Sequence, residues 1–146
     1  LTQELSNAIV ANDQDRVKFL VEKGADVNKP DNQGGTPLTN AARQRQDKMV
    51  ELLIKLGANV NEANTDGMTP LTTAVMRDHV PTVKVLLAKG ADAEKPGPEG
   101  FRPLAVAIAE DKYEVAKALM EADPGVQSGI FAYRIAPLRV FYPWQP

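Results

Sequence analysis

The chain has 146 residues, of which 43% are hydrophobic and 25% are charged, a composition typical of one folded domain with a buried core. The formal net charge is -2, and without clustered Lys and Arg we expect neither nucleic acid nor a membrane surface as a partner. The absence of cysteine excludes disulfides, thiolate metal sites and cysteine nucleophiles. We expect a cytoplasmic location, although a periplasmic or secreted protein would fit the composition equally well.

A spacing of 33 residues organises the chain from its beginning. The triplet Thr-Pro-Leu at 36–38 recurs at 69–71 and, with arginine in place of threonine, at 102–104. The same spacing relates four alanines and four leucines, namely Ala8, Ala41, Ala74 and Ala107, and Leu20, Leu53, Leu86 and Leu119. We therefore divide residues 1–125 into four units, at about 1–30, 31–63, 64–96 and 97–125.

Each unit predicts two helices followed by a hairpin, and the second unit shows the pattern most clearly. Thr36 precedes Pro37 as an N-cap hydroxyl precedes a first-turn proline, which predicts a short first helix. After the polar residues 43–47, apolar residues fall on one stripe over 48–56, and Gly57 supplies the left-handed residue that ends this second helix. The alanines of the repeat are small enough to let helices of neighbouring units touch, so we expect the units to stack.

Residues 31–61 and 65–94 resemble successive ankyrin repeats, and the resemblance covers about residues 1–123. It implies an all-α ankyrin-repeat solenoid of helix-turn-helix units with short β-hairpin fingers. It also implies a noncatalytic protein-protein interaction module, an adaptor or scaffold, because the family binds partners rather than turning over substrates. Two alternatives stay open: a regulatory or inhibitory fragment of a larger enzyme, and a pathogen effector that engages host proteins.

The chain departs from the family pattern after the Thr-Pro-Leu triplet, where the family usually has histidine. Here the positions hold Thr39, Thr72 and Ala105. A hydroxyl can replace part of the hydrogen-bond network of that histidine, and alanine cannot. We therefore expect a protein of marginal stability.

His79 is the only histidine, and it stands where the family has a structural histidine between its two helices. The alternative is a general acid or base, but no nucleophile motif surrounds it. A lone histidine without further clustered ligands also makes a transition-metal site unfavourable. We expect no catalytic residue, no metal, no cofactor and no enzymatic activity.

The resemblance places partner contacts on the finger tips and on the exposed, concave face of the first helices. These positions are Gln33, Arg43, Asp66, Met68, Met76, Arg77, Glu99, Phe101 and Glu110. Met68 and Phe101 occupy the same finger position in adjacent units, so we expect them side by side, with arginines as polar anchors, as at the centres of many interfaces. The alternative is that Phe101 folds back and covers its own finger.

Residues 126–146 contain most of the aromatic side chains, and Arg134 and Arg139 are their only charged residues. Ala-Pro-Leu at 136–138 falls about one period after the triplet at 102–104, which predicts a degenerate fifth repeat or capping segment. Pro143 and Pro146 prevent a normal second helix there. The alternative is a free segment that binds a partner or a second copy as an extended strand, so we expect a monomer, with a dimer formed through this segment as the rival.

Overall fold

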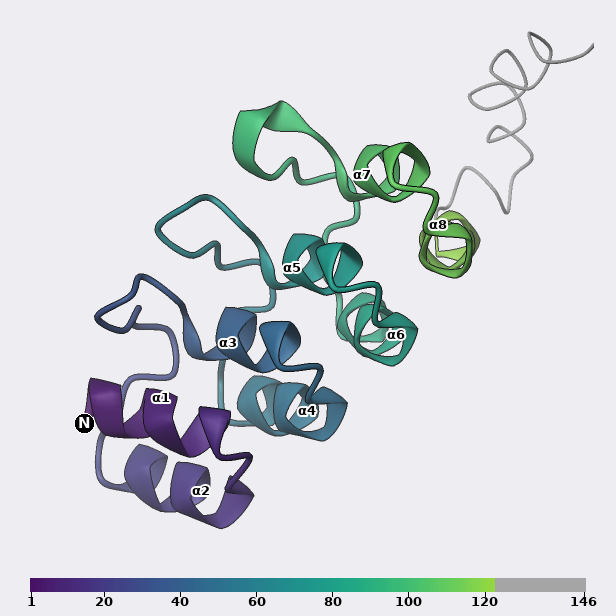
Figure 1. Cartoon of the computed structure of the whole chain (residues 1–146). Helices are drawn as coiled ribbons and strands as arrows, with labels where there is room; N and C mark the ends of the chain where they lie inside the picture. The colour runs from purple at the N-terminus through teal and green to yellow at the C-terminus, as the bar shows by residue number, and fades with distance from the viewer. Residues whose placement is uncertain (123–146) are drawn as a thin grey trace, which may run out of the picture.

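The structure, a computed structural model, describes residues 1–122 (Figure 1). Within them lie eight α-helices and one short 3-10 turn, η1 (Pro98–Gly100). The helices are α1 (Thr2–Val10), α2 (Gln14–Glu22), α3 (Pro37–Arg43), α4 (Asp47–Lys55), α5 (Pro70–Met76), α6 (Val80–Ala88), α7 (Pro103–Ala109) and α8 (Tyr113–Glu121). The expected fifth-repeat or capping segment, 126–146, lies outside the described residues.

Successive pairs of helices stack in two layers (Figure 1). The first helices α1, α3, α5 and α7 pack each on the next, and α4, α6 and α8 do the same in the second layer. The loops that join one pair to the next project together from one side of the first-helix layer (Figure 1). This arrangement confirms the predicted all-α solenoid of helix-turn-helix units.

The helix ends follow local sequence signals. The hydroxyl of Thr36 accepts a hydrogen bond from the backbone N–H of Thr39 at 3.1 Å and caps α3, and Thr69 caps α5 in the same way. Proline at the first turn of both helices removes an N–H group that would have no partner there. Gly57, at φ +104°, follows the C-cap of α4 in the left-handed conformation that the sequence predicts.

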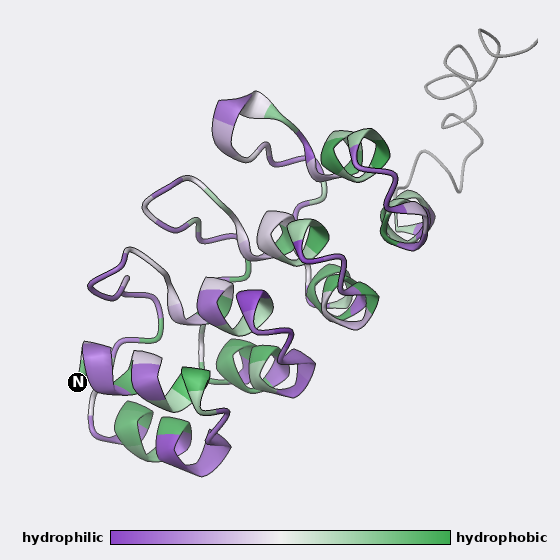
Figure 2. Ribbon diagram, viewed as in Figure 1, coloured by the Kyte–Doolittle hydropathy of each residue, from purple (hydrophilic) through white to green (hydrophobic). Residues whose placement is uncertain are grey.

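The core lies between and within the two helix layers. All four alanines of the repeat are at most 5% exposed, and all four leucines at most 2%. Figure 2 shows that the hydrophobic residues are concentrated in the stacked helices, whereas the projecting loops are mostly hydrophilic. The four alanines are buried in the first helices, which pack one on the next, and small side chains allow helices to approach closely.

The projecting loops, which we call fingers, close as hairpins, but no strand occurs in residues 1–122. At the tip of the second finger, the N–H of Asn64 donates to the carbonyl of Met68 at 2.9 Å. The side-chain oxygen of Asn64 also accepts hydrogen bonds from the N–H groups of Asp66 and Met68, at 2.9 Å each. Because a side chain satisfies these amides, the finger needs no β ladder. The expected β-hairpin fingers are therefore hairpin loops.

Two asparagines at the spacing of 33 join neighbouring units. The side-chain oxygen of Asn28 accepts from the N–H of Asn59 at 2.7 Å, and that of Asn61 accepts from the N–H of Asp92 at 2.8 Å. Each bond connects the loop after one second helix to the equivalent loop of the next unit. None of the helices in residues 1–122 is long and apolar enough to cross a membrane.

Candidate functional site

A hollow of about 280 Å³ opens between the fingers and the first-helix layer, where the second and third units meet. It is lined by Arg43, Asn64, Asp66, Met68, Thr73, Met76 and Arg77. Five of these are among the nine residues that the sequence predicts for partner binding. The structure thus brings residues of α3, α5, the α5 C-cap and the second finger to one concave place, which we call the finger-face hollow.

The finger-face hollow offers both apolar surface and positive charge. Met76 is 49% exposed, and Met68 is half-buried. Neither Arg43 nor Arg77 forms an ion pair with an acidic side chain of residues 1–122, although Asp66 lines the same hollow. Both guanidinium groups can therefore donate to a partner, and methionine can adapt to its shape.

A hydrogen-bond network in the second unit holds Arg43, which lines the hollow. The Arg43 guanidinium donates to the side-chain oxygen of Asn40 at 3.4 Å, and the amide of Asn40 donates to the carboxylate of Asp31 at 2.8 Å. The hydroxyl of Ser6, from the first unit, donates to the same carboxylate oxygen at 2.6 Å. Burial would raise the pKa of Asp31, but these two hydrogen bonds and those from the backbone N–H groups of Gln33 and Gly35 outweigh it and hold the pKa below its ordinary value.

A lysine of the fourth unit holds the C-terminal end of α5 beside the hollow. The Lys112 ammonium donates to the carbonyls of Val75 at 3.1 Å and Met76 at 2.6 Å, and it pairs with the carboxylate of Glu110 at 2.7 Å. A cation at a helix C-terminus stabilises the last carbonyl groups. From the second unit, Arg45 donates to the carbonyl of Arg77 at 3.0 Å. Both contacts tie the rim of the hollow to its neighbours.

The other four predicted residues lie on the fingers or at the end of α7 and do not line the finger-face hollow. Gln33 is exposed on the first finger, and Glu99 is exposed in η1 with φ at +64°. Phe101 is 56% exposed, so its ring does not fold back to cover its own finger. Glu110 is engaged with Lys112. Five of the nine predicted residues therefore form one cluster, and the other four lie at separate positions.

Asn64 and Thr73 line the hollow and were not predicted from the sequence. Asn64 carries a turn signal, because it begins the segment Asn-Thr-Asp-Gly, but that signal points to a turn rather than to a contact. Thr73 donates its hydroxyl proton to the carbonyl of Thr69 at 2.9 Å inside α5. Its place beside the hollow depends on how the second finger lies over α5, which local sequence does not show.

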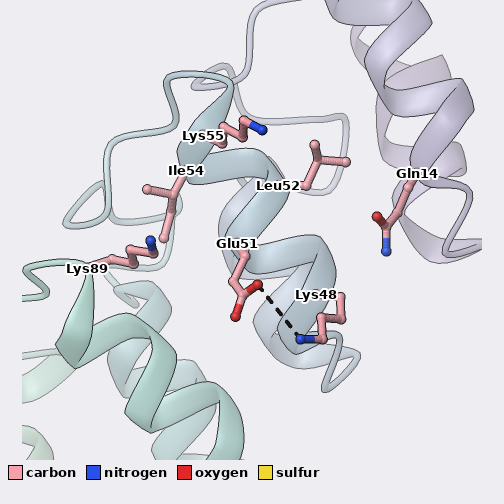
Figure 3. Close-up of a pocket in the computed structure, with 7 residues that line it drawn as sticks. All are labelled: Gln14, Lys48, Glu51, Leu52, Ile54, Lys55 and Lys89. Carbon is pink, nitrogen blue, oxygen red and sulfur yellow. Dashed lines mark ion pairs between the residues drawn. The ribbon is translucent and has the colours of Figure 1, made fainter.

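A second hollow, of about 440 Å³, lies on the second-helix layer, on the other side of the stack from the fingers (Figure 3). It is lined by Gln14, Lys48, Glu51, Leu52, Ile54, Lys55 and Lys89. Lys48 and Glu51 form an ion pair at 4.0 Å, and both side chains are well exposed. Figure 3 shows that Gln14 comes from α2, whereas Lys48, Glu51, Leu52, Ile54 and Lys55 come from α4.

His79 has the structural role that the family pattern implies. Its Nδ1 atom lies 2.8 Å from the hydroxyl of Thr82 and accepts from the Thr82 N–H at 3.3 Å, which caps the start of α6. Thr82 is fully buried. Among residues 1–122, no three His, Asp or Glu side chains lie close enough together to hold a metal ion.

The geometry of stacked helix pairs with fingers defines a repeat solenoid, a class of protein whose units contact only their neighbours. A family model described as "Ankyrin repeats (3 copies)" matches residues 5–64 and 56–128. The chain therefore belongs to the ankyrin repeat family, whose domains are generally protein-binding modules and typically noncatalytic. A search of curated proteins found no match.

Proposed function

We propose that this chain binds another protein through its finger face, with the finger-face hollow as the centre of the interface. The observation that carries the proposal is the convergence of Met68, Met76, Arg43 and Arg77 at one hollow. Methionine and arginine are enriched at interface centres, where a partner removes their apolar surface from water. The chain acts as an adaptor or scaffold and carries out no chemistry itself.

The chemistry of the hollow suggests what the partner presents. An apolar side chain of the partner enters between the two methionines, and a carboxylate beside it accepts hydrogen bonds from Arg43 or Arg77. Because the two methionines are flexible and polarizable, they accept apolar side chains of several shapes. Arg43 is less adaptable, since the Asp31 network holds the Asn40 side chain to which it donates.

The test compares two charge reversals that change the net charge equally. The first, Arg43→Glu with Arg77→Glu, alters the finger-face hollow, and the second, Lys48→Glu with Lys55→Glu, alters the hollow on the second helices. Each variant and the wild type are used to capture proteins from a lysate of the source cells, and the captured proteins are quantified. The dissociation constant of each specific partner is then measured.

We expect the finger-face reversal to weaken binding of the specific partner by about thirty-fold or more, which corresponds to about 2 kcal/mol for one hot spot. The reversal on the second helices leaves binding within about threefold of wild type, as contacts outside the hot spot do. The opposite ranking would move the interface to the second-helix layer. Equal losses from both reversals would indicate attraction by net charge alone and contradict a defined site.

The contribution of apolar side chains on the wider finger face is tested by Met68→Ser combined with Phe101→Ser. Phe101 is exposed and Met68 is half-buried, so the melting temperature changes little. Binding is lost, because truncating a hot-spot side chain removes a large share of the binding free energy. A large fall in the melting temperature would mean that these side chains cover the fingers instead.

A further inference from the structure

The C-terminal end of α5 carries two residues of the finger-face hollow. Met76 is the last residue of α5, and Arg77 is its C-cap. The last carbonyl groups of a helix have no partner inside the helix, so other groups must hold this end in place. How firmly the end is held decides how much order the two side chains still have to gain when a partner binds.

Backbone N–H groups satisfy only part of this helix end. The N–H of Asp78, a residue with φ at +53°, donates to the carbonyl of Val75 at 3.0 Å. Within residues 1–122, no backbone N–H donates to the carbonyls of Met76 and Arg77. These two carbonyls therefore depend on side chains or on water for their hydrogen bonds.

Cationic side chains from both neighbouring units bind these two carbonyls. Helix α5 lies between α3 and α7 in the stack (Figure 1). From the second unit, the Arg45 guanidinium donates to the carbonyl of Arg77 at 3.0 Å. From the fourth unit, the Lys112 ammonium donates to the carbonyls of Met76 at 2.6 Å and Val75 at 3.1 Å. Positive charge at this place also interacts favourably with the dipole of the helix.

Lys112 stands at a position that elsewhere serves its own unit. Two of its three counterparts at the spacing of 33 residues cap their own second helices. Asp13 accepts from the N–H of Arg16 at 2.9 Å, and His79 accepts from that of Thr82 at 3.3 Å. Lys112 is the N-cap residue of α8 but forms no side-chain cap, because an ammonium has no acceptor. Its hydrogen bonds to backbone carbonyls hold the third unit instead.

The Lys112 side chain is placed to act on the hollow only through α5. It is 13% exposed, and its ammonium is also paired with the Glu110 carboxylate at 2.7 Å. Lys112 is not among the residues that line the finger-face hollow, whereas Met76 and Arg77 are. A change at Lys112 therefore leaves the lining side chains as they are and alters only how the helix end beneath two of them is held.

From these contacts we infer that Lys112 is a positioning residue of the finger-face hollow, and that the fourth unit thereby sets the affinity of a site to which it contributes no lining residue. The inference rests on the proposed function of that hollow. Lys112 keeps the last turn of α5 closed, so a partner meets Met76 and Arg77 already in place and does not have to order them. Without the ammonium, this end of α5 opens more often and the partner binds less tightly.

The test is Lys112→Met, which removes the ammonium and keeps an unbranched side chain. The matched control is Lys95→Met, because the Lys95 ammonium donates to the carbonyl of Asn61 in the neighbouring unit at 2.8 Å and does not line the hollow. Hydrogen exchange of the full chain is followed by nuclear magnetic resonance. Relative to the central amides of α5, we expect those of Arg77 and Asp78 to exchange about tenfold faster in Lys112→Met, as the loss of a hydrogen bond from a charged group implies. They should be unchanged in Lys95→Met.

Binding is measured with the protein that the wild type captures and the finger-face reversal, Arg43→Glu with Arg77→Glu, loses. Its dissociation constant should rise about fivefold with Lys112→Met, less than for a hot-spot contact, and stay at the wild-type value with Lys95→Met. Lys112→Arg keeps a cationic donor and should bring both measurements back toward wild type.

Each contrary result has its own meaning. Unchanged exchange at the end of α5 in Lys112→Met would overturn the positioning role whatever the partner is. Faster exchange with an unchanged dissociation constant would overturn the link to binding, and equal effects of Lys95→Met would reduce both lysines to general stabilisers of the stack. If the finger-face reversal itself lost no captured protein, the proposed function would fail, even where exchange showed that Lys112 holds α5.

Discussion

Leu53→Ala tests the stacked core at its centre. Leu53 lies in α4, is 0% exposed, and belongs to a helix that packs on both α3 and α6. Loss of three carbon groups at about 0.8 kcal/mol each removes about 2.4 kcal/mol of transfer free energy. Neighbouring units hold the surrounding helices in place, so the cavity cannot close fully, and the total cost rises toward about 5 kcal/mol.

Urea unfolding of both proteins measures this cost. With a slope of about 1–3 kcal/mol per molar, a loss of about 3 kcal/mol lowers the unfolding midpoint by about 1–3 M. Leu52→Ala in the same helix is the matched control, because Leu52 is only half-buried and its truncation should cost about 1 kcal/mol. If Leu53→Ala unfolded at the wild-type midpoint, or if the two variants were equally stable, the assignment of the buried stripe would be refuted.

Thr69 caps α5, whereas Arg102 at the equivalent position of α7 forms no side-chain cap. Thr69→Ala should therefore cost about 1–2 kcal/mol, and Arg102→Ala, which loses only an exposed ion pair with Glu94, about 0–1 kcal/mol. The urea midpoints of the two variants measure this difference. Equal costs would mean that the Thr69 cap does not stabilise α5. Asp31→Asn should lower the free energy of unfolding at pH 7, because the pKa of Asp31 is held below its ordinary value in the folded state. That contribution is complete above the unfolded-state pKa of about 3.9 and disappears as the pH falls through the lower folded-state pKa, so the two proteins should converge in acid. A stability difference that stayed constant from pH 7 into the acid range would contradict this account.

The sequence predicted the features that depend on residues close together along the chain. Thr36 caps its helix because its hydroxyl meets an amide three residues away, and Gly57 ends α4 through its own backbone freedom. The stacking of units was also predictable, because the spacing of 33 residues places Ala41, Ala74 and Ala107 at equivalent contacts. Residues that recur at a fixed spacing occupy equivalent positions in successive repeat units.

The candidate site was predictable in part. The fingers and first helices were identified as the binding face from the family resemblance, and five of the nine residues named on that basis line one hollow. Phe101, at the finger position equivalent to Met68, is 56% exposed and does not line the hollow. Its finger contains the turn η1, with Glu99 at φ +64°.

Only the tertiary structure showed the side-chain contacts between units that do not recur from one repeat to the next. Lys112 reaches back 36 residues to the carbonyl of Met76, and Ser6 reaches forward 25 residues to Asp31. Neither contact recurs with the period of the repeat, so the pattern carries no trace of it. The sequence by itself determined the helices and their stacking, because those follow from local capping and from a repeated apolar stripe. The shape of the finger-face hollow was decided by how the second and third units meet, because it depends on which side chains of the two units face each other.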